Sequence, residues 1–203
     1  MTATTTSTTL PAERTRVLPP INILKWVEEN KHQLKPPVGN KYLYDGDGFF
    51  VMVIGGPNAR NDFHVTNSEE YFYQVQGDII VRIQEDGIIK DVPLREGETM
   101  FIPGGVPHSP TRPPDTIGVV VELRRPPGEK EHQQFYCAKC DQLVHDKEFD
   151  CADIVKHFAQ SMEDYWADSA LNTCKNCGHQ NGKPTPIKEI IFEPQVKIIR
   201  EGD

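Results

Sequence analysis

Turn signals divide the middle of this chain into short β-prone runs, and this rhythm limits the possible folds more than any other feature. Between Lys41 and about Leu123, β-branched and aromatic runs alternate with turns rich in Gly, Pro, Asp and Asn. The runs are 49–54, 71–75, 79–83, 88–94, 99–102 and 118–123. Short, evenly spaced strands indicate a β-sandwich or a small barrel. The 17 Pro and 15 Gly among 203 residues also suit a turn-rich β fold.

We expect four segments along the chain. They are a disordered Thr-rich tail at 1–17, a β barrel at 18–126, an extension at 127–182 and a C-terminal tail at 183–203. A short helix capped by Asn22 should open the barrel segment and end by Pro36. The sequence Pro-Pro-Gly at 126–128 indicates a linker, and apolar residues at helical spacing predict one helix at about 151–167. The last segment holds one strand-like run, 187–192.

Composition restricts the partners that this chain could bind. The formal net charge of −8 disfavours broad binding to nucleic acid or to anionic lipid. No apolar run approaches the length of about 18 residues that a membrane-spanning helix needs. The N-terminal residues lack the apolar core of a secretory signal, so we expect a cytoplasmic, reducing environment. The expected partners are therefore small molecules, with any anionic ligand held by locally placed arginines.

Two histidine motifs in the β region carry the strongest chemical signal. The first runs from His64 to Glu70, and the second is a glycine- and proline-framed stretch that ends at His108. One histidine alone is more often structural, but two imidazoles and a carboxylate form the set that holds non-haem Fe(II) on one face. Side chains alternate along a strand, so Glu70 can share a face with His64, whereas Glu69 would point away. We therefore predict a catalytic metal site at these two histidines and Glu70.

Two C-x2-C pairs lie in the extension. They are Cys137 with Cys140 and Cys174 with Cys177. Four thiolates saturate a tetrahedral metal and leave no position for a substrate, so we predict a structural iron or zinc site rather than a disulfide pair. The fifth cysteine, Cys151, is expected to be a small buried hydrophobe.

The histidine motifs resemble the paired motifs of the cupin superfamily, with Thr66 in place of the second histidine of the first motif. Four blocks resemble the 3-hydroxyanthranilate 3,4-dioxygenase family more closely: 36–41, 55–60, 70–74 and 107–113. This resemblance covers about residues 17–180, and the cysteine pairs resemble a rubredoxin-like extension of bacterial-type members. It implies an all-β fold, namely a small cupin (jelly-roll) barrel with short helices and a C-terminal four-cysteine metal knob. It also implies a homodimer.

The resemblance further implies an Fe(II)-dependent, extradiol-type ring-cleaving dioxygenase. Such an enzyme converts 3-hydroxyanthranilate and O2 to 2-amino-3-carboxymuconate 6-semialdehyde, the precursor of quinolinate in de novo NAD biosynthesis. The cofactors would be Fe(II) at the catalytic site and a second Fe or Zn at the four cysteines. The alternative is a small-molecule-binding or sensing cupin without oxygenase activity, which would not need charged side chains to converge on the metal.

Three further residues are candidates for the reaction. Arg60, four residues before His64, is expected to stabilise dioxygen as negative charge develops on it, unless it is a surface arginine. The guanidinium of Arg112 suits bidentate capture of the substrate carboxylate, although a phosphate or an internal ion pair would suit it equally well. Glu122 lies in an apolar run and is expected to contact the hydroxyl and amino groups of the substrate and to help proton movement. Glu70 would both bind the iron and lie within reach of the substrate amine. Glu122 could instead pair with Arg124 or Arg112, or face solvent on an edge strand.

Overall fold

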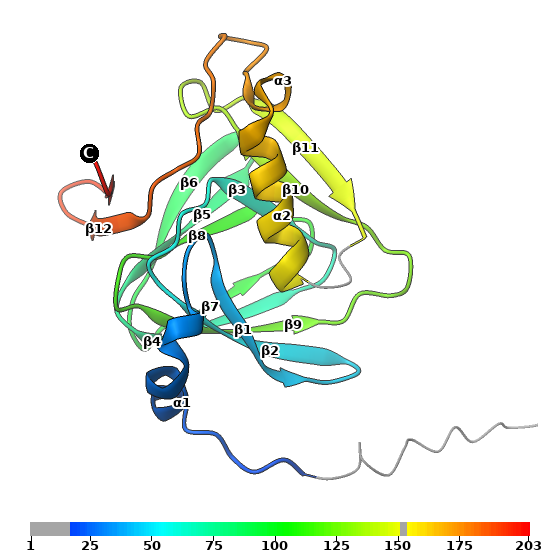
Figure 1. Cartoon of the computed structure of the whole chain (residues 1–203), viewed down its shortest axis with the longest axis vertical. Coiled ribbons are helices and arrows are strands. Elements are labelled where there is room, and N and C mark those ends of the chain that lie inside the picture. The colour runs from blue at the N-terminus through cyan, green and yellow to red at the C-terminus, as the bar shows by residue number, and fades with distance from the viewer. Residues whose placement is uncertain (1–16, 151–153) are drawn as a thin grey trace, which may run out of the picture.

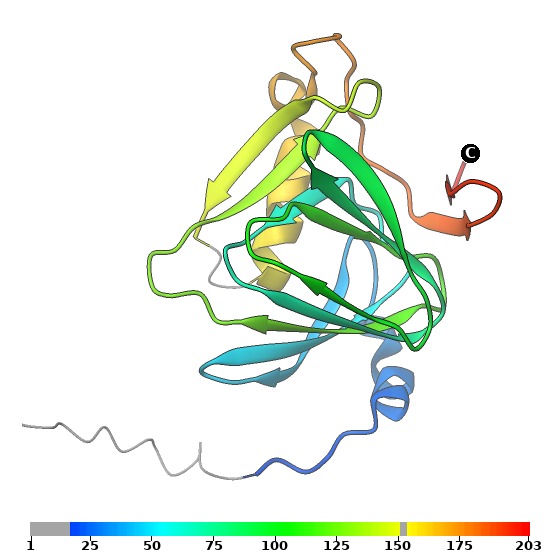
Figure 2. The ribbon, with the colours of Figure 1, turned by 180° about the vertical axis from the view of Figure 1, so that it is seen from behind.

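The computed structural model describes residues 17–150 and 154–203, and most of its strands form two facing antiparallel sheets (Figure 1). The five-stranded sheet has the order β1 (Gly39–Asp45), β2 (Phe49–Gly55), β9 (Ile117–Leu123), β4 (Glu70–Gln76), β7 (Thr99–Ile102). The six-stranded sheet has the order β11 (Leu143–Phe149), β10 (Glu131–Tyr136), β3 (Asp62–Val65), β8 (His108–Thr111), β5 (Ile79–Glu85), β6 (Ile88–Leu94). Seen from behind, the two sheets curl toward each other as a barrel (Figure 2).

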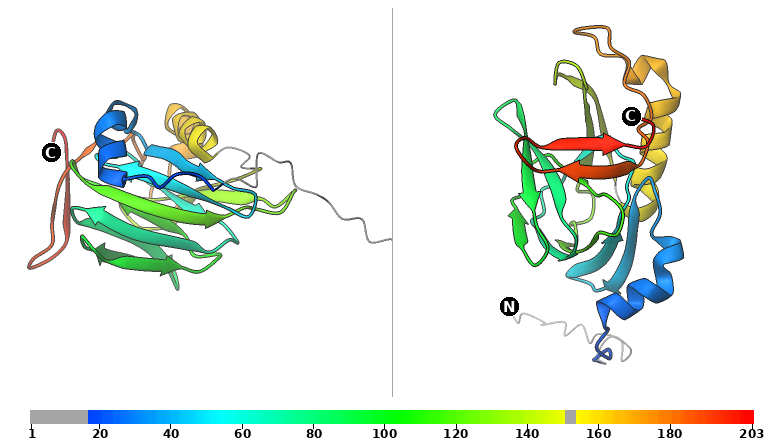
Figure 3. Two further views of the ribbon diagram at one scale, coloured as in Figure 1. Left: turned by 90° about the horizontal axis from the view of Figure 1, so that it is seen from below. Right: turned by 90° about the vertical axis from the view of Figure 1, so that its left-hand side faces the viewer.

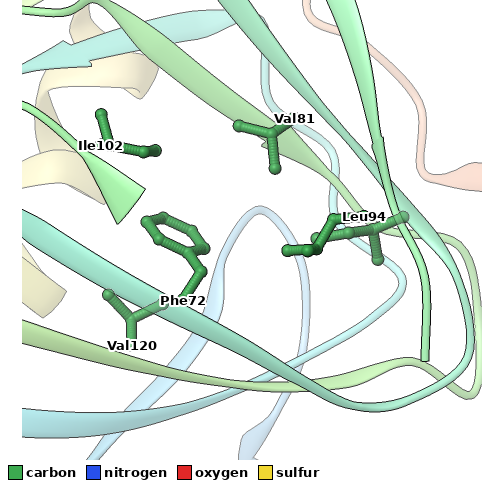
Figure 4. Close-up of a cluster of buried hydrophobic side chains, with 6 residues drawn as sticks. Phe72, Val81, Leu94, Ile102 and Val120 are labelled. Atoms are coloured by element: carbon green, nitrogen blue, oxygen red, sulfur yellow. The ribbon is translucent and has the colours of Figure 1, made fainter. Parts of the chain in front are cut away.

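The hydrophobic core fills the space between the two sheets (Figure 4). Phe72 and Val120 from the five-stranded sheet meet Val81 and Leu94 from the six-stranded sheet, and all four are buried. Along β4, buried and exposed residues alternate, as the two-residue repeat of a strand requires. The same alternation places Glu70 at the start of β4 on the inner face.

Short helices cover parts of the barrel. Helix α1 (Ile23–Asn30) is followed by the 3-10 turn η2 (Lys31–Gln33), and α2 (Ile154–Ala167) is followed by α3 (Ser169–Asn172). The backbone N–H of Lys25 donates to the Asn22 side chain at 3.0 Å, which confirms the expected cap of α1. Trp26 and Val27 of this helix pack against Val53 on the outer side of the five-stranded sheet. None of the helices in the described ranges combines the length and apolar character needed to cross a membrane.

Helix α2 lies across one opening of the barrel (Figure 1). Its first half carries Phe158, which packs with Phe50 and Met52. Its second half carries Tyr165, whose ring stacks on Phe135 of β10 with 3.7 Å between centroids. The helix predicted at 151–167 is confirmed over 154–167. Residues 151–153, and with them the expectation for Cys151, lie outside the described residues.

Several strands were absent from the predicted pattern. The predicted runs match β2, β4, β5, β6, β7 and β9 within a few residues, but β1, β3, β8, β10 and β11 were not predicted. Strand β10 buries polar residues, including Glu131 and Gln133, so it shows no apolar alternation. Because β10 pairs with β3, the first part of the chain beyond residue 126 continues the six-stranded sheet of the barrel. The division of the chain into a barrel at 18–126 and an extension at 127–182 remains a prediction.

The C-terminal segment forms a hairpin rather than the single strand that its sequence predicts. Strands β12 (Ile187–Ile191) and β13 (Lys197–Arg200) pair with each other and lie across one side of the barrel (Figure 3). The hairpin packs on Ile80 of β5 through Ile187 and Ile190. The tail expected at 1–17 falls, apart from Val17, outside the described residues.

Candidate metal centre and its surroundings

His64, Glu70 and His108 meet inside the barrel. The two histidines are neighbours on β3 and β8 of the six-stranded sheet, whereas Glu70 faces them from β4 of the other sheet. Strand alternation predicted that Glu70 would share a strand face with His64, but the two residues lie on different sheets. Glu70 is buried and Glu69 is exposed. Glu70 therefore lies beside the histidines because β4 turns it toward the opposite sheet, and not because it shares a strand with His64.

The spacing of the three side chains fits a metal ion. Glu70 Oε1 lies 3.1 Å from His64 Nδ1 and 3.2 Å from His108 Nε2. Two donor atoms about 2.1 Å from a metal and at right angles to each other lie about 3.0 Å apart, close to both distances. Within the described residues, Glu70 Oε1 is buried and accepts no well-angled hydrogen bond. An acceptor left in this state is expected where a cation binds.

The outer nitrogens of both imidazoles are held by protein groups. His64 Nε2 lies 2.6 Å from Glu131 Oε2, and His108 Nδ1 lies 2.9 Å from the Val106 carbonyl oxygen. Contacts of this kind fix ring orientation and leave the other nitrogen free to bind a metal. The edge of the His64 ring also meets Phe158 of α2, with 4.7 Å between ring centroids. The donor set is therefore oriented before any ion binds.

Buried carboxylates make this interior attractive to cations. Burial alone would lower the pKa of His64, but its contacts with Glu131 and Glu70 outweigh burial and raise this pKa to about 9. Burial would raise the pKa of Glu70, yet His108 and His64 hold it well below its usual range. Without a metal these contacts favour the positively charged form of His64, with a proton on each ring nitrogen. A divalent ion would take the place of the proton on Nδ1, the nitrogen that faces Glu70.

Glu122 faces the same interior from β9, beside Glu70. It is buried, and its Oε2 accepts a hydrogen bond from Arg125 Nη2 at 2.7 Å. Arg125 also contacts Glu131, with 2.7 Å from Nε to Oε1, so one guanidinium joins the two carboxylates. Burial and the charge of Glu70 raise the pKa of Glu122 to about 7. The arginine that pairs with Glu122 is therefore Arg125, not Arg112 or Arg124, which the sequence had suggested.

Arg60 lines the cavity of the metal centre, and Arg112 lines a cavity that adjoins it. Arg60 lines the cavity of about 50 Å³ that His64, Glu70 and His108 also line. Its guanidinium makes two hydrogen bonds to Asp62, at 2.8 and 2.6 Å. Burial opposes ionisation of Asp62, but Arg60 lowers the pKa of this carboxyl. Arg60 is thus held at the cavity wall by a bidentate ion pair.

Arg112 lies deeper and is 1% exposed. It lines an adjoining cavity of about 30 Å³ that shares Arg60 with the first. Its Nη1 donates to Gln74 Oε1 at 3.1 Å, while its Nε has no acceptor among the described residues. A Cβ on Gly118 would lie 2.6 Å from the guanidinium, so only glycine leaves room for it there. Burial and the nearby Arg60 lower the pKa of Arg112 to about 9, as expected for a cation without a carboxylate partner.

The structure adds residues that the sequence did not single out. Glu131, Arg125 and Phe158 all support the centre, and two of them lie in or beside a polar stretch that resembled a linker. The pairing of β10 with β3 brings Glu131 within reach of His64. The residue of β10 that pairs directly with His64 is Gln133, and Glu131 lies two positions earlier. No local pattern in the sequence carries this information.

The four cysteines of the two C-x2-C pairs form a second cluster. Cys137 Sγ lies 3.6 Å from Cys177 Sγ, and Cys140 Sγ lies 3.7 Å from Cys174 Sγ. Sulfurs about 2.3 Å from a tetrahedral metal lie about 3.8 Å apart, which these distances approach. The Gln142 N–H and the Asn176 amide lower the pKa of Cys140 to about 6, whereas burial and the neighbouring sulfurs raise the pKa of Cys177 to about 12. The geometry fits a closed metal site and not a disulfide pair.

Two features define the class of this protein: a two-sheet β barrel and an interior metal centre of two histidines and one glutamate. The model of 3-hydroxyanthranilic acid dioxygenases matches residues 16–166, so the chain belongs to this family. The expected fold class, a cupin-type barrel with short helices and a C-terminal cysteine cluster, is confirmed.

Relatives from bacteria and fungi support the assignment. A 3-hydroxyanthranilate 3,4-dioxygenase from Xanthomonas campestris pv. campestris is 41% identical over 177 residues, covering 87% of this chain and 99% of the relative. The enzyme of that name from Neurospora crassa is 42% identical over 159 residues, covering 78% and 88%. Among solved structures, a cupin-2 domain containing protein from Shewanella frigidimarina aligns with 51% of this chain and 94% of its own, at 15% identity and a TM-score of 0.43.

Replacing Glu131 with Gln should weaken metal binding at the barrel centre by about tenfold to a hundredfold, because His64 loses the carboxylate that orients its ring. Competition with a chelator measures this affinity. Glu148→Gln, on the exposed neighbouring strand, is the matched control. An unchanged affinity in Glu131→Gln would show that Glu131 does not orient the ligand.

Replacing Cys174 and Cys177 together with Ser should remove about one equivalent of bound metal per chain and lower the melting temperature, since a structural site contributes folding energy. Some turnover should survive, because these sulfurs are separate from the barrel centre. Metal analysis and thermal unfolding give the readouts. A folded variant without any turnover would show that this cluster takes part in the chemistry.

Proposed function

We propose that this chain is a 3-hydroxyanthranilate 3,4-dioxygenase. It opens the ring of 3-hydroxyanthranilate with O2 to give 2-amino-3-carboxymuconate 6-semialdehyde, which supplies quinolinate for NAD biosynthesis. Family membership supports this proposal, and so do the names of relatives at 41% and 42% identity. The observation that carries it is the buried group of His64, Glu70 and His108 beside two guanidinium groups.

Ferrous iron is the metal that we assign to the barrel centre. Two imidazoles and one carboxylate are the donor set of non-haem Fe(II) oxygenases. Bound there, iron would lower the pKa of the substrate hydroxyl and allow electron density to pass from the ring to O2. The part of the protein is to fix His64 and His108 through their outer nitrogens and to exclude water with Phe158 and the surrounding apolar wall.

Arg112 is the group that we assign to the substrate carboxylate. It is a buried cation with an unused Nε–H, and it lines the cavity next to the metal centre. A carboxylate would supply the charge partner that the described residues around its guanidinium do not. Binding by this side chain turns the hydroxyl and amino groups of the ring toward Glu70 and the histidines, because the two cavities adjoin through Arg60.

Glu122 and Arg60 complete the assignment. Glu122, with its pKa of about 7, can hold or release a proton at the carboxyl oxygens that face the substrate hydroxyl and amino groups. Glu70 lies beside Glu122 and within reach of the substrate amine. Arg60 places a positive charge at the cavity wall, where it stabilises dioxygen as negative charge develops. Asp62 keeps that charge in place.

Further parts of the proposal concern the second metal, the assembly and the compartment. We assign iron or zinc to the four cysteines, and we place the protein in the reducing cytoplasm.

We also propose that the protein is a homodimer. Exposed apolar side chains on the outer face of the five-stranded sheet support it, including Phe101, Tyr71 and Leu123, which are 57%, 44% and 48% exposed. Light scattering gives the mass that tests the dimer.

Turnover by the iron-loaded protein tests the function. Anaerobic addition of Fe(II) and 3-hydroxyanthranilate, followed by air, should consume O2 and produce the near-ultraviolet absorbance of an extended semialdehyde. His108→Ala should abolish turnover and iron retention, while His32→Ala, exposed beside α1, should leave both unchanged. Binding of the compound without O2 uptake would favour a sensing cupin instead.

Replacing Arg112 with Met should raise the KM for 3-hydroxyanthranilate by about tenfold or more and change kcat much less, since a charge-assisted contact shared by ground and transition states is lost. Methionine preserves most of the buried volume. Steady-state kinetics at fixed O2 measures both constants. A KM equal to that of the parent would exclude Arg112 as the carboxylate-binding residue.

A further inference from the structure

The loop of residues 56–61, which carries Arg60, is held on its outer side by the C-terminal segment. Arg200 Nη2 donates to the Arg60 carbonyl oxygen at 3.2 Å, and the Ile187 N–H donates to the Asn58 carbonyl oxygen at 2.9 Å. Asn58 in turn accepts from the Arg112 N–H at 3.0 Å through its side chain. Two carbonyl groups of the loop therefore depend on residues more than a hundred positions later in the chain.

Arg200 is itself firmly placed. Its Nη1 donates to the Thr185 carbonyl oxygen at 2.7 Å, so one guanidinium joins the C-terminal segment to the Arg60 backbone. Its own N–H donates to the Asp203 side chain at 2.8 Å. A guanidinium presents its N–H groups in a rigid plane, which suits it to hold two carbonyl groups at a fixed separation.

The hairpin that ends at Arg200 is docked on the barrel. Ile187 is fully buried against Ile80 of β5, and Ile198 packs in the same cluster. Arg95 lies over the Phe192 ring at 5.1 Å and adds a contact at the tip of the hairpin. In Figure 3 the two C-terminal strands cross one side of the barrel. Arg200 thus reaches the loop from an anchored element.

The hairpin lies beyond residues 16–166, the part that the family model matches. We propose that Arg200 is a positioning residue for Arg60, and that the C-terminal hairpin sets the place of this catalytic guanidinium. The proposal rests on the proposed function. Asp62 fixes the Arg60 side chain, whereas Arg200 fixes its main chain, so both ends of the residue are held. Loss of the main-chain contact frees the loop to turn and moves the guanidinium away from the metal centre.

Arg200→Ala tests the proposal against a role in stability alone. It should lower kcat/KM for O2 by about tenfold, through the loss of the hydrogen bond to the Arg60 carbonyl and of loop order, and leave the KM for 3-hydroxyanthranilate nearly unchanged. Arg95→Ala removes a contact of the same hairpin without touching the loop, so it should lower the melting temperature but not this constant. Arg200→Lys, which keeps the charge but reaches one carbonyl at a time, should recover part of the loss.

A double-mutant cycle with Arg60→Ala decides whether Arg200 acts through Arg60. In the Arg60→Ala background, Arg200→Ala should have almost no further effect on kcat/KM for O2, because the group that it positions is gone. Fully multiplicative effects, or an equal loss in Arg95→Ala, would overturn the proposal. If Arg200→Ala does not fold, Arg200→Gln, which keeps one donor group, takes its place in the cycle.

Hydrogen exchange supplies a readout that does not need turnover. Amides of residues 56–62 should exchange faster in Arg200→Ala than in the parent and in Arg95→Ala. Unchanged exchange would overturn the mechanical link even in an active enzyme. Faster exchange in a protein that does not turn over 3-hydroxyanthranilate would keep the link and reject the proposed function.

Discussion

The metal centre depends on two sheets that face each other across a narrow interior. The five-stranded sheet brings the carboxylates of Glu70 and Glu122, and the six-stranded sheet brings His64, His108 and Glu131. Buried carboxylates are costly unless a cation faces them, and here the imidazoles and Arg125 meet that need. The hydrophobic contacts around Phe72 keep the sheets at the separation that this arrangement requires.

The same interior holds two groups of charged side chains on different sides. Glu122, Glu131 and Arg125 form one side of the centre, while Arg60 and Arg112 form another. A small anionic ring would therefore meet its carboxylate partner at one end of the cavity and the metal and proton-holding groups at the other. Charge placement would then orient the ring, because apolar side chains such as Val38 and Ile54 line both cavities.

Much of the fold, and the three side chains that meet at the barrel centre, could be predicted from the sequence. Short β-branched and aromatic runs bounded by turns mark β2, β4, β5 and β9, and the cap at Asn22 marks α1, since these signals are local. The partners of the centre could not be predicted, because Glu131 and Arg125 reach it only through strand pairing and loop path. The second strand of the hairpin at 187–200 could not be predicted either. Its hydrophobic residues follow no regular pattern in the sequence, and the hairpin packs on the distant residue Ile80.

Strand β10 has a consequence for how the two clusters influence each other. It begins at Glu131, which touches His64, and ends at Tyr136, immediately before Cys137. A slip of this strand by one residue would turn His132 inward and Glu131 outward, since side chains alternate between faces. A metal bound by the four cysteines would fix the end of β10 and oppose such slippage. The distant sulfur cluster would in this way keep Glu131 beside His64.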